Sequence, residues 1–306
     1  MQLPVSCKLC PRACGANRAA GEHGVCGADD TLRVARAALH AWEEPPISGW
    51  RGSGTVFFSN CPLQCVYCQN ESISSGRVGK AIAVERLARI FLELQKQGAH
   101  NINLVTPTQY VPQITEALAT ARMAGLQLPV VYNTSGYETV ETIEMLKGHV
   151  DIYLTDFKYC DPKLACRYSN APDYEQLALR ALRAMLAQVG DYTLGDEGIL
   201  QRGVIVRHLL LPGQLGDSKA VVATVFSACK NRVCYSLMNQ YTPLLGGGCE
   251  RFAELGTTVS EADYSALIDF ALGLGITNSF MQEGGTAEES FIPPFDLTGV
   301  EAAHDG

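Results

Sequence analysis

The sequence predicts an α/β fold: a partial, TIM-like (βα)6 barrel with an N-terminal cysteine-rich metal-binding extension. From about residue 52 onward, short β-like runs alternate with amphipathic helical stretches, which is typical of a parallel sheet with helices outside it. The cysteines are unevenly placed, since seven of the twelve precede residue 69. We therefore expect three units: residues 1–50 as the extension, 51–290 as the barrel and 291–306 as a C-terminal tail.

The extension contains four cysteines within twenty residues and closes at the pair Pro45-Pro46, which is typical of a connector. Four thiolates can close one metal site, and both zinc and an auxiliary iron–sulfur cluster accept four of them. The site would relay electrons or bind substrate, or it would be a metal staple that orders a segment poor in apolar residues. The expected ligands are Cys7, Cys10, Cys14 and Cys26.

Six strands are legible in the expected barrel. They are short runs rich in β-branched, aromatic and aliphatic residues, at 55–59, 102–106, 129–133, 151–157, 199–211 and 234–240. Right-handed crossovers would curl such a sheet into a partial barrel. A closed eight-fold barrel needs about 250 residues and two more strands, so we favour an open one.

Helices are expected between the strands, where apolar residues recur at i, i+3 and i+4. The expected helices cover 84–94, 114–121, 138–146, 174–189, 219–229 and 261–272. Ser260 is the expected N-cap of the last helix, with Asp263 in its first turn.

Composition excludes several classes of protein. The net charge is −8 and no block of lysine or arginine stands out, so we expect no nucleic-acid partner. No apolar run approaches the roughly 20 residues of a membrane span, and the N-terminus does not resemble a signal peptide. We expect a cytoplasmic protein, in which many cysteines indicate metal or cluster binding because disulfides are rare there.

The most informative feature is Cys61-x3-Cys65-x2-Cys68, directly after the first expected barrel strand. Three thiolates can hold three corners of a cubic iron–sulfur cluster and leave one iron open for a substrate or cofactor. A closed zinc site would need a fourth ligand, and no histidine lies within the loop. The position also suits catalysis, because the carboxyl ends of strands carry the chemistry in such folds.

The segment 54–70 resembles the radical S-adenosylmethionine (SAM) superfamily in its cysteine spacing, its place after the first strand and Tyr67 before the last cysteine. The resemblance implies a [4Fe–4S] cluster on Cys61, Cys65 and Cys68, with SAM bound at the open iron and near Tyr67. Reduction of the cluster, by a donor such as flavodoxin or ferredoxin, would cleave SAM to methionine and a 5′-deoxyadenosyl radical. That radical would abstract a hydrogen atom from a substrate.

Further strand ends extend the resemblance, here to activases of glycyl radical enzymes. The segment 131–137, with Asn133 and Ser135, is similar to their loop that reaches the SAM ribose. Asp156 and Lys158 resemble their Asp-x-Lys strand beside the methionine end of SAM. Being two apart on a strand, these two side chains share one face, so they could instead simply pair at the barrel mouth.

Arg207, in the segment 206–213, resembles the arginine of these activases that binds the SAM carboxylate. A planar guanidinium suits that role because it pairs bidentately with a carboxylate. The alternative is an ordinary surface ion pair.

One departure concerns the loop after the second strand. Many activases carry Gly-Gly-Glu there, and the glutamate meets the SAM ammonium; this chain has Thr106-Pro107-Thr108. The hydroxyls of Thr106 and Thr108 can still accept hydrogen bonds from SAM, but the negative charge is gone. Together with segments 238–243 and 291–296, this loop resembles the pyruvate formate-lyase activating enzyme-like subgroup of radical SAM proteins.

The substrate stays open at this point. The first hypothesis is activation of a glycyl radical enzyme, a protein partner on which a glycine radical would be placed. The alternative is modification of a small molecule, a peptide or another protein, with Gln240, Tyr241, Cys249 and Glu283 as candidate pocket residues. A third hypothesis is a non-enzymatic redox carrier or zinc-stabilised binding protein.

Overall fold

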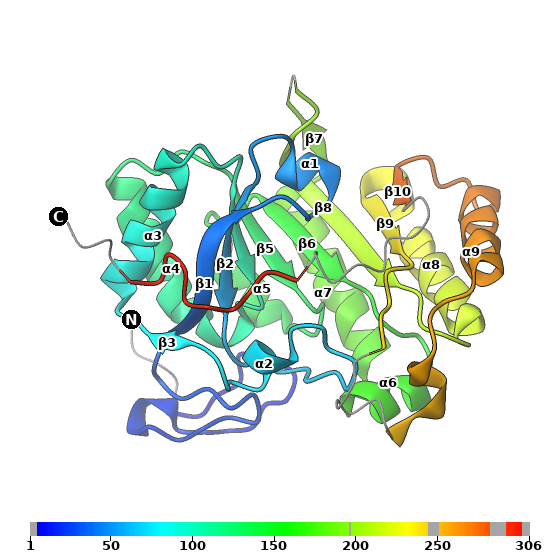
Figure 1. Cartoon of the computed structure of the whole chain (residues 1–306), viewed down its shortest axis with the longest axis horizontal. Coiled ribbons are helices and arrows are strands. Elements are labelled where there is room, and N and C mark those ends of the chain that lie inside the picture. The colour runs from blue at the N-terminus through cyan, green and yellow to red at the C-terminus, as the bar shows by residue number, and fades with distance from the viewer. Residues whose placement is uncertain (1–4, 196, 244–250, 282–291, 302–306) are drawn as a thin grey trace.

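A mostly parallel β-sheet forms the centre of the protein, as the sequence predicts (Figure 1). The computed structural model describes residues 5–195, 197–243, 251–281 and 292–301. The parallel strands are β2 (Ser53–Phe58), β4 (Ile102–Val105), β5 (Val130–Thr134), β6 (Ile152–Asp156), β8 (Leu200–Leu209), β9 (Cys234–Met238) and β10 (Ser279–Met281). They follow the order β10-β9-β8-β6-β5-β4-β2 across the sheet. All six expected strands are present, and the α/β prediction is confirmed.

Antiparallel strands extend the sheet beyond β2. Strand β1 (Arg33–His40) pairs with β2, and β3 (Lys80–Ala81) pairs with β1. Strand β7 (Thr193–Leu194) forms a hairpin with β8. Among the described residues, no pairing joins β3 to β10, so the sheet stays open. The division at residue 50 remains a prediction, although β1 lies before that point and is part of this sheet.

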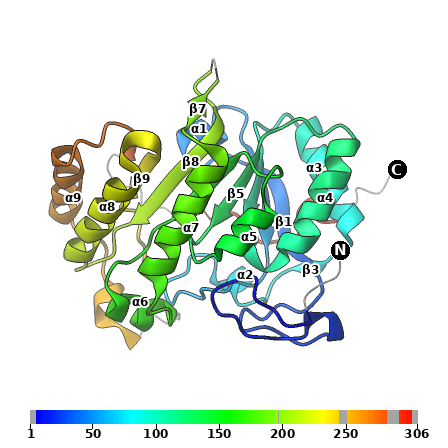
Figure 2. The same cartoon turned by 180° about the vertical axis from the view of Figure 1, so that it is seen from behind.

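Helices cover one face of the sheet, as Figure 2 shows. They are α3 (Val84–Lys96), α4 (Val111–Met123), α5 (Val140–Met145), α7 (Tyr174–Val189) and α8 (Leu215–Cys229), with α9 (Glu261–Gly273) packed against α8. Each matches an expected helix. Ser260 caps α9 by accepting a hydrogen bond from the Asp263 backbone N–H at 3.1 Å. Within the described part of the chain, no helix is both long and apolar enough to cross a membrane.

Three helices were not expected: α1 (Pro45–Ser48), α2 (Glu71–Ser74) and α6 (Pro162–Ser169). The first two are single turns, too short for a helical periodicity to show in the sequence. Helix α6 begins at a proline preceded by Asp161, whose side chain caps it. It follows β6 and packs with α7 beside the cysteine loop.

The described residues 292–301 return to strand β1 (Figure 1). Leu297 donates its backbone N–H to Ala35 at 3.1 Å, and Ala37 donates to Thr298 at 2.8 Å. Gly299 adopts φ +70°, and a Cβ there would lie 2.0 Å from the Ala37 carbonyl oxygen. The described part of the expected tail is therefore bound closely to the sheet.

Candidate active site

The three-cysteine loop leaves the carboxyl end of β2 through a tight turn. Asn60 and Gln64 adopt left-handed backbone conformations, with φ of 73° and 53°, which asparagine tolerates better than most residues. The Asn60 backbone N–H donates to Ile73 at 2.7 Å, and its side-chain oxygen accepts from the Tyr110 hydroxyl at 3.1 Å. These contacts hold the start of the loop in place.

The loop gathers three thiols in a dry environment. Burial, together with the neighbouring cysteines, raises the pKa of Cys61 to about 12 and that of Cys68 to about 11. Cys65 accepts a hydrogen bond from the Ser169 hydroxyl at 3.1 Å. Thiols in such a place ionise when a metal takes the thiolate. Three thiols that line one cavity, with no fourth ligand from their own loop, are the number that a cluster with one open iron requires.

These cysteines and the strand ends line one cavity of about 210 Å³. It receives side chains from the ends of β4, β5, β6, β8 and β9, as expected for a parallel sheet. All the residues predicted for the cluster and SAM except Thr108 line it: Cys61, Cys65, Cys68, Tyr67, Thr106, Asn133, Ser135, Asp156, Lys158 and Arg207. Their individual roles remain predictions.

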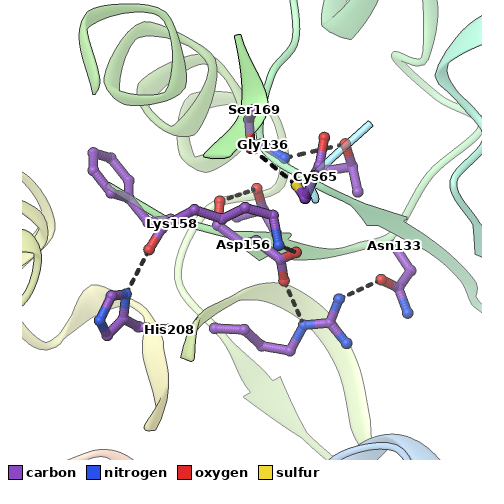
Figure 3. A network of polar contacts seen from close by, with 12 residues as sticks. Cys65, Asn133, Gly136, Asp156, Lys158, Ser169 and His208 are labelled. Atoms are coloured by element: carbon purple, nitrogen blue, oxygen red, sulfur yellow. Dashed lines mark hydrogen bonds and ion pairs between the residues drawn. The ribbon is translucent and has the colours of Figure 1, made fainter. Parts of the chain in front are cut away.

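Asp156 is the centre of a buried polar network in this cavity (Figure 3). Its two carboxylate oxygens pair with Arg207 Nε at 2.9 Å and with Lys158 Nζ at 2.7 Å. Arg207 Nη2 also donates to Asn133 Oδ1 at 2.6 Å. Burial alone would raise the pKa of Asp156, but the charges of Arg207 and Lys158 hold it below its usual value. The sequence analysis gave an ion pair between Asp156 and Lys158 as the alternative to a role at SAM. This ion pair does form, and it lies inside the cavity.

Two backbone features bring the ends of β5 and β6 together. Gly136 adopts φ +77°, and a Cβ there would lie 2.2 Å from the Asp156 carbonyl oxygen, so only glycine permits this approach. The Tyr174 hydroxyl donates to the Ser135 carbonyl at 2.7 Å and accepts from the Lys158 backbone N–H at 3.0 Å. One buried hydroxyl therefore fixes both strand ends.

Thr108 does not line this cavity. It begins a short 3-10 turn, Thr108–Tyr110, is 2% exposed, and donates its hydroxyl to Glu138 Oε1 at 2.6 Å. Thr106 does line the cavity, with φ at 57°. The structure therefore separates the two threonines that the sequence analysis placed together at SAM, because the turn directs the second one behind the cavity.

Two glutamates near the site were not predicted. Glu138 accepts hydrogen bonds from the hydroxyls of Thr108, Thr134 and Tyr132. Burial raises its pKa from 4.5 to about 7. Glu43 accepts from Asn103 at 3.0 Å and lies 3.5 Å from Arg207 Nη1. Glu43 immediately precedes the segment interpreted as a connector, so only its acidic side chain next to Glu44 could have indicated it.

The N-terminal cysteines converge at a second, very small cavity beside the first. Cys7, Cys10, Cys14 and Cys26 line it together with Pro62 of the cluster loop. Arg12 joins the two loops by donating to the backbone carbonyls of Pro62, Leu63, Ser169 and Asn170. Over the described residues, no three or more His, Cys, Asp or Glu side chains form a recognisable site for a metal ion.

The four residues predicted to line a substrate pocket lie in different places. Gln240 lines the 210 Å³ cavity. Tyr241 is 2% exposed and donates its hydroxyl to the Leu255 carbonyl at 2.6 Å, which is a packing position. Cys249 and Glu283 lie outside the described residues.

The chain is similar in sequence to known proteins. The family described as the Radical SAM superfamily matches residues 55–210, about half of the chain. An uncharacterized protein of Methanocaldococcus jannaschii is 30% identical over 247 residues, covering 78% of this chain and 66% of the relative.

Two solved structures are also similar. Streptococcus suis SuiB, bound to the precursor peptide SuiA, gives a TM-score of 0.50 at 14% identity, over 73% of this chain and 46% of SuiB. A domain of pyruvate-formate lyase-activating enzyme from Bacteroides vulgatus gives 0.37 at 14% identity, over 56% of this chain and 93% of the domain. This chain thus corresponds to part of SuiB. From the family match and the cavity that its cysteines line, we conclude that the chain belongs to the radical SAM superfamily.

Proposed function

We propose that this protein is a radical SAM enzyme whose cluster is held by Cys61, Cys65 and Cys68. The observation that carries the proposal is that these thiols share one cavity with the strand-end residues predicted to hold SAM. When bound, the cluster and SAM supply a one-electron cleavage to methionine and a 5′-deoxyadenosyl radical, which abstracts a hydrogen atom from the substrate.

The residues around the cavity hold its charged side chains in place and exclude water. Asp156 and Asn133 orient the Arg207 guanidinium through Nε and Nη2, and its remaining N–H groups would pair with a carboxylate such as that of SAM. Asp156 also holds Lys158 as a cation within the cavity. Leu63 is fully buried and Tyr67 is 6% exposed, so the cluster loop presents a dry wall to the cavity. A dry, fixed charge pattern stabilises charged ligands more strongly than water does.

The substrate class belongs to the same proposal. The first candidate is a glycine of a glycyl radical enzyme, and the alternative is a small molecule, a peptide or another protein. The protein is proposed to be cytoplasmic and to receive electrons from a flavodoxin or ferredoxin. A separate partner chain would need to reach this cavity, which Gln240 and Met238 also line.

We also propose a metal at Cys7, Cys10, Cys14 and Cys26. Four thiols line one cavity, and burial raises the pKa of Cys10 to about 12 and also raises that of Cys26. Buried thiols in such a group are well suited to metal binding because the metal replaces their protons. Zinc would make the site a staple for the loop beside Pro62, whereas an iron–sulfur cluster there would lie next to the first cluster.

The test is anaerobic reconstitution with iron and sulfide, followed by dithionite and SAM. We expect 5′-deoxyadenosine to form, and a protein that holds a cluster but forms none would contradict the radical SAM proposal in favour of a redox carrier. Iron and zinc analysis of the Cys61/Cys65/Cys68→Ala triple variant then measures the metal bound at the N-terminal cysteines alone. Residual iron indicates an auxiliary cluster, zinc indicates a staple, and neither metal contradicts the site.

A further inference from the structure

A third and larger cavity opens beside the cluster cavity. It has a volume of about 670 Å³, within the range of small-molecule sites. The two cavities share Arg207, Met238 and Gln240 as lining residues. A ligand in the larger cavity would therefore lie next to the residues that surround the proposed SAM site.

The lining of this cavity contains more carboxyl groups than cations. Its carboxylates are Glu43 and Glu44, and among the described lining residues Arg207 is the one cation. Part of this guanidinium is already paired, since Nε bonds to Asp156 at 2.9 Å, Nη2 donates to Asn133 at 2.6 Å and Nη1 lies 3.5 Å from Glu43. Burial raises the pKa of both glutamates and the charge of Arg207 opposes that rise, so a cationic ligand beside Glu44 would favour its ionised form.

Glu44 has unused hydrogen-bonding capacity. The residue is 8% exposed, and the Ser236 hydroxyl, also in the cavity lining, hydrogen-bonds its carboxylate. Its second oxygen, Oε2, is buried and has no hydrogen-bond partner. A buried carboxylate oxygen without a partner is costly, and a cationic donor in the cavity would satisfy it.

Large apolar side chains form another part of the lining. Trp42 is 57% exposed, and Met238, Phe280 and Met281 complete this side of the cavity. Such surfaces accept an alkyl stem, and an aromatic ring attracts a cation near its face. The two halves of the lining match a ligand with a charged end on an apolar stem.

We propose that the 670 Å³ cavity is the substrate site and that Glu44 binds a cationic nitrogen of the substrate, carried on an apolar stem. This inference rests on the proposed function and names its substrate class. A free alkylamine and a lysine side chain of a peptide share this chemistry. Glu44 is a binding residue in this account and takes no part in cleaving SAM.

The test reads binding by fluorescence, without any radical chemistry. The chain has two tryptophans, Trp42 and Trp50, so a Trp50→Phe variant reports on the cavity through Trp42 alone. Full-length, anaerobically purified protein is titrated with n-hexylammonium and n-hexanol. It is also titrated with two capped tripeptides that carry a central lysine or a central norleucine.

We expect at least one charged probe to bind roughly 10-fold or more tightly than its uncharged counterpart. Glu44→Gln, made in the Trp50→Phe background, should remove that difference. Glu261→Gln, which removes an equal charge from the exposed start of α9, should keep it. Equal affinity within both pairs, or a preference that survives Glu44→Gln, would overturn the inference.

The pair of probes that shows the preference identifies the source of the ligand. If Glu44→Gln does not fold, equal affinity within both pairs of probes still overturns the inference. Failure of the proposed function looks different: the ammonium preference would persist while reconstituted protein forms no 5′-deoxyadenosine. Conversely, formation of 5′-deoxyadenosine without any ammonium preference would refute this inference alone.

Discussion

Glu138 makes a measurable contribution to how stability depends on pH. Its carboxyl is 1% exposed and accepts three hydroxyl donors on Oε1, while Oε2 is buried without a partner. Burial raises its pKa from 4.5 to about 7, against the opposing hydrogen bonds. Because the folded pKa is raised, the folded state holds this proton more tightly than the unfolded state does.

The sign and the size of the effect follow from linkage. The contribution of Glu138 to stability is fully present below pH 4.5 and is lost as the pH rises to about 7. A difference of about 2.5 pKa units at about 1.4 kcal/mol each gives roughly 3 kcal/mol. The free energy of unfolding of the wild type, relative to Glu138→Gln, should therefore fall by about 3 kcal/mol between pH 4 and pH 8.

The assay is urea denaturation followed by circular dichroism, on metal-free and thiol-reduced protein across that pH range. Comparing wild type with variant at each pH cancels the other titrating groups. Glu141→Gln, an exposed carboxylate three residues along the same segment, is the matched control. A wild-type minus Glu138→Gln difference that is flat with pH would refute the account of Glu138 as a buried, proton-binding carboxyl.

Two further substitutions test the supports of the site. Asp156→Asn leaves the buried cations Arg207 and Lys158 without their shared partner, and we expect a loss of about 3–5 kcal/mol in urea denaturation at pH 7. That loss should shrink as the pH falls through the lowered pKa of Asp156, and a loss independent of acid would contradict the ion pairs. Arg12→Ala removes the donors that join the N-terminal loop to the cluster loop, at a cost of roughly 2–4 kcal/mol. An unchanged melting temperature in differential scanning fluorimetry would contradict a stabilising role of Arg12 between these two loops.

The strand ends of the site could be predicted from the sequence because the fold class determines where they meet. Asn133, Asp156 and Arg207 each follow a buried run of a parallel strand, and parallel strands bring their carboxyl ends to one edge. Alternation along the strand then selects the residues that share a face. The cysteine spacing predicted the cluster loop, which forms the remaining wall of the cavity.

The parts that could not be predicted depend on tertiary contacts without a local signal. Thr108 lies in a 3-10 turn that directs it to Glu138, a residue thirty positions away. Strand β10 has three residues, too few to show a pattern. Strand β1 was hidden in a cysteine-rich segment, and its pairing with β2 brings Glu43 and Glu44 to the mouth of the barrel.

The most direct test of the central claim is the electron paramagnetic resonance spectrum of the reduced cluster, recorded with and without SAM. The claim is that the cysteine loop and the strand ends form one site, with Arg207 fixed by Asp156 and Asn133. Adding SAM should change the spectrum of the wild type, and Arg207→Lys should need roughly 10-fold or more SAM for the same change. A cluster whose spectrum ignores SAM in the wild type would contradict the account.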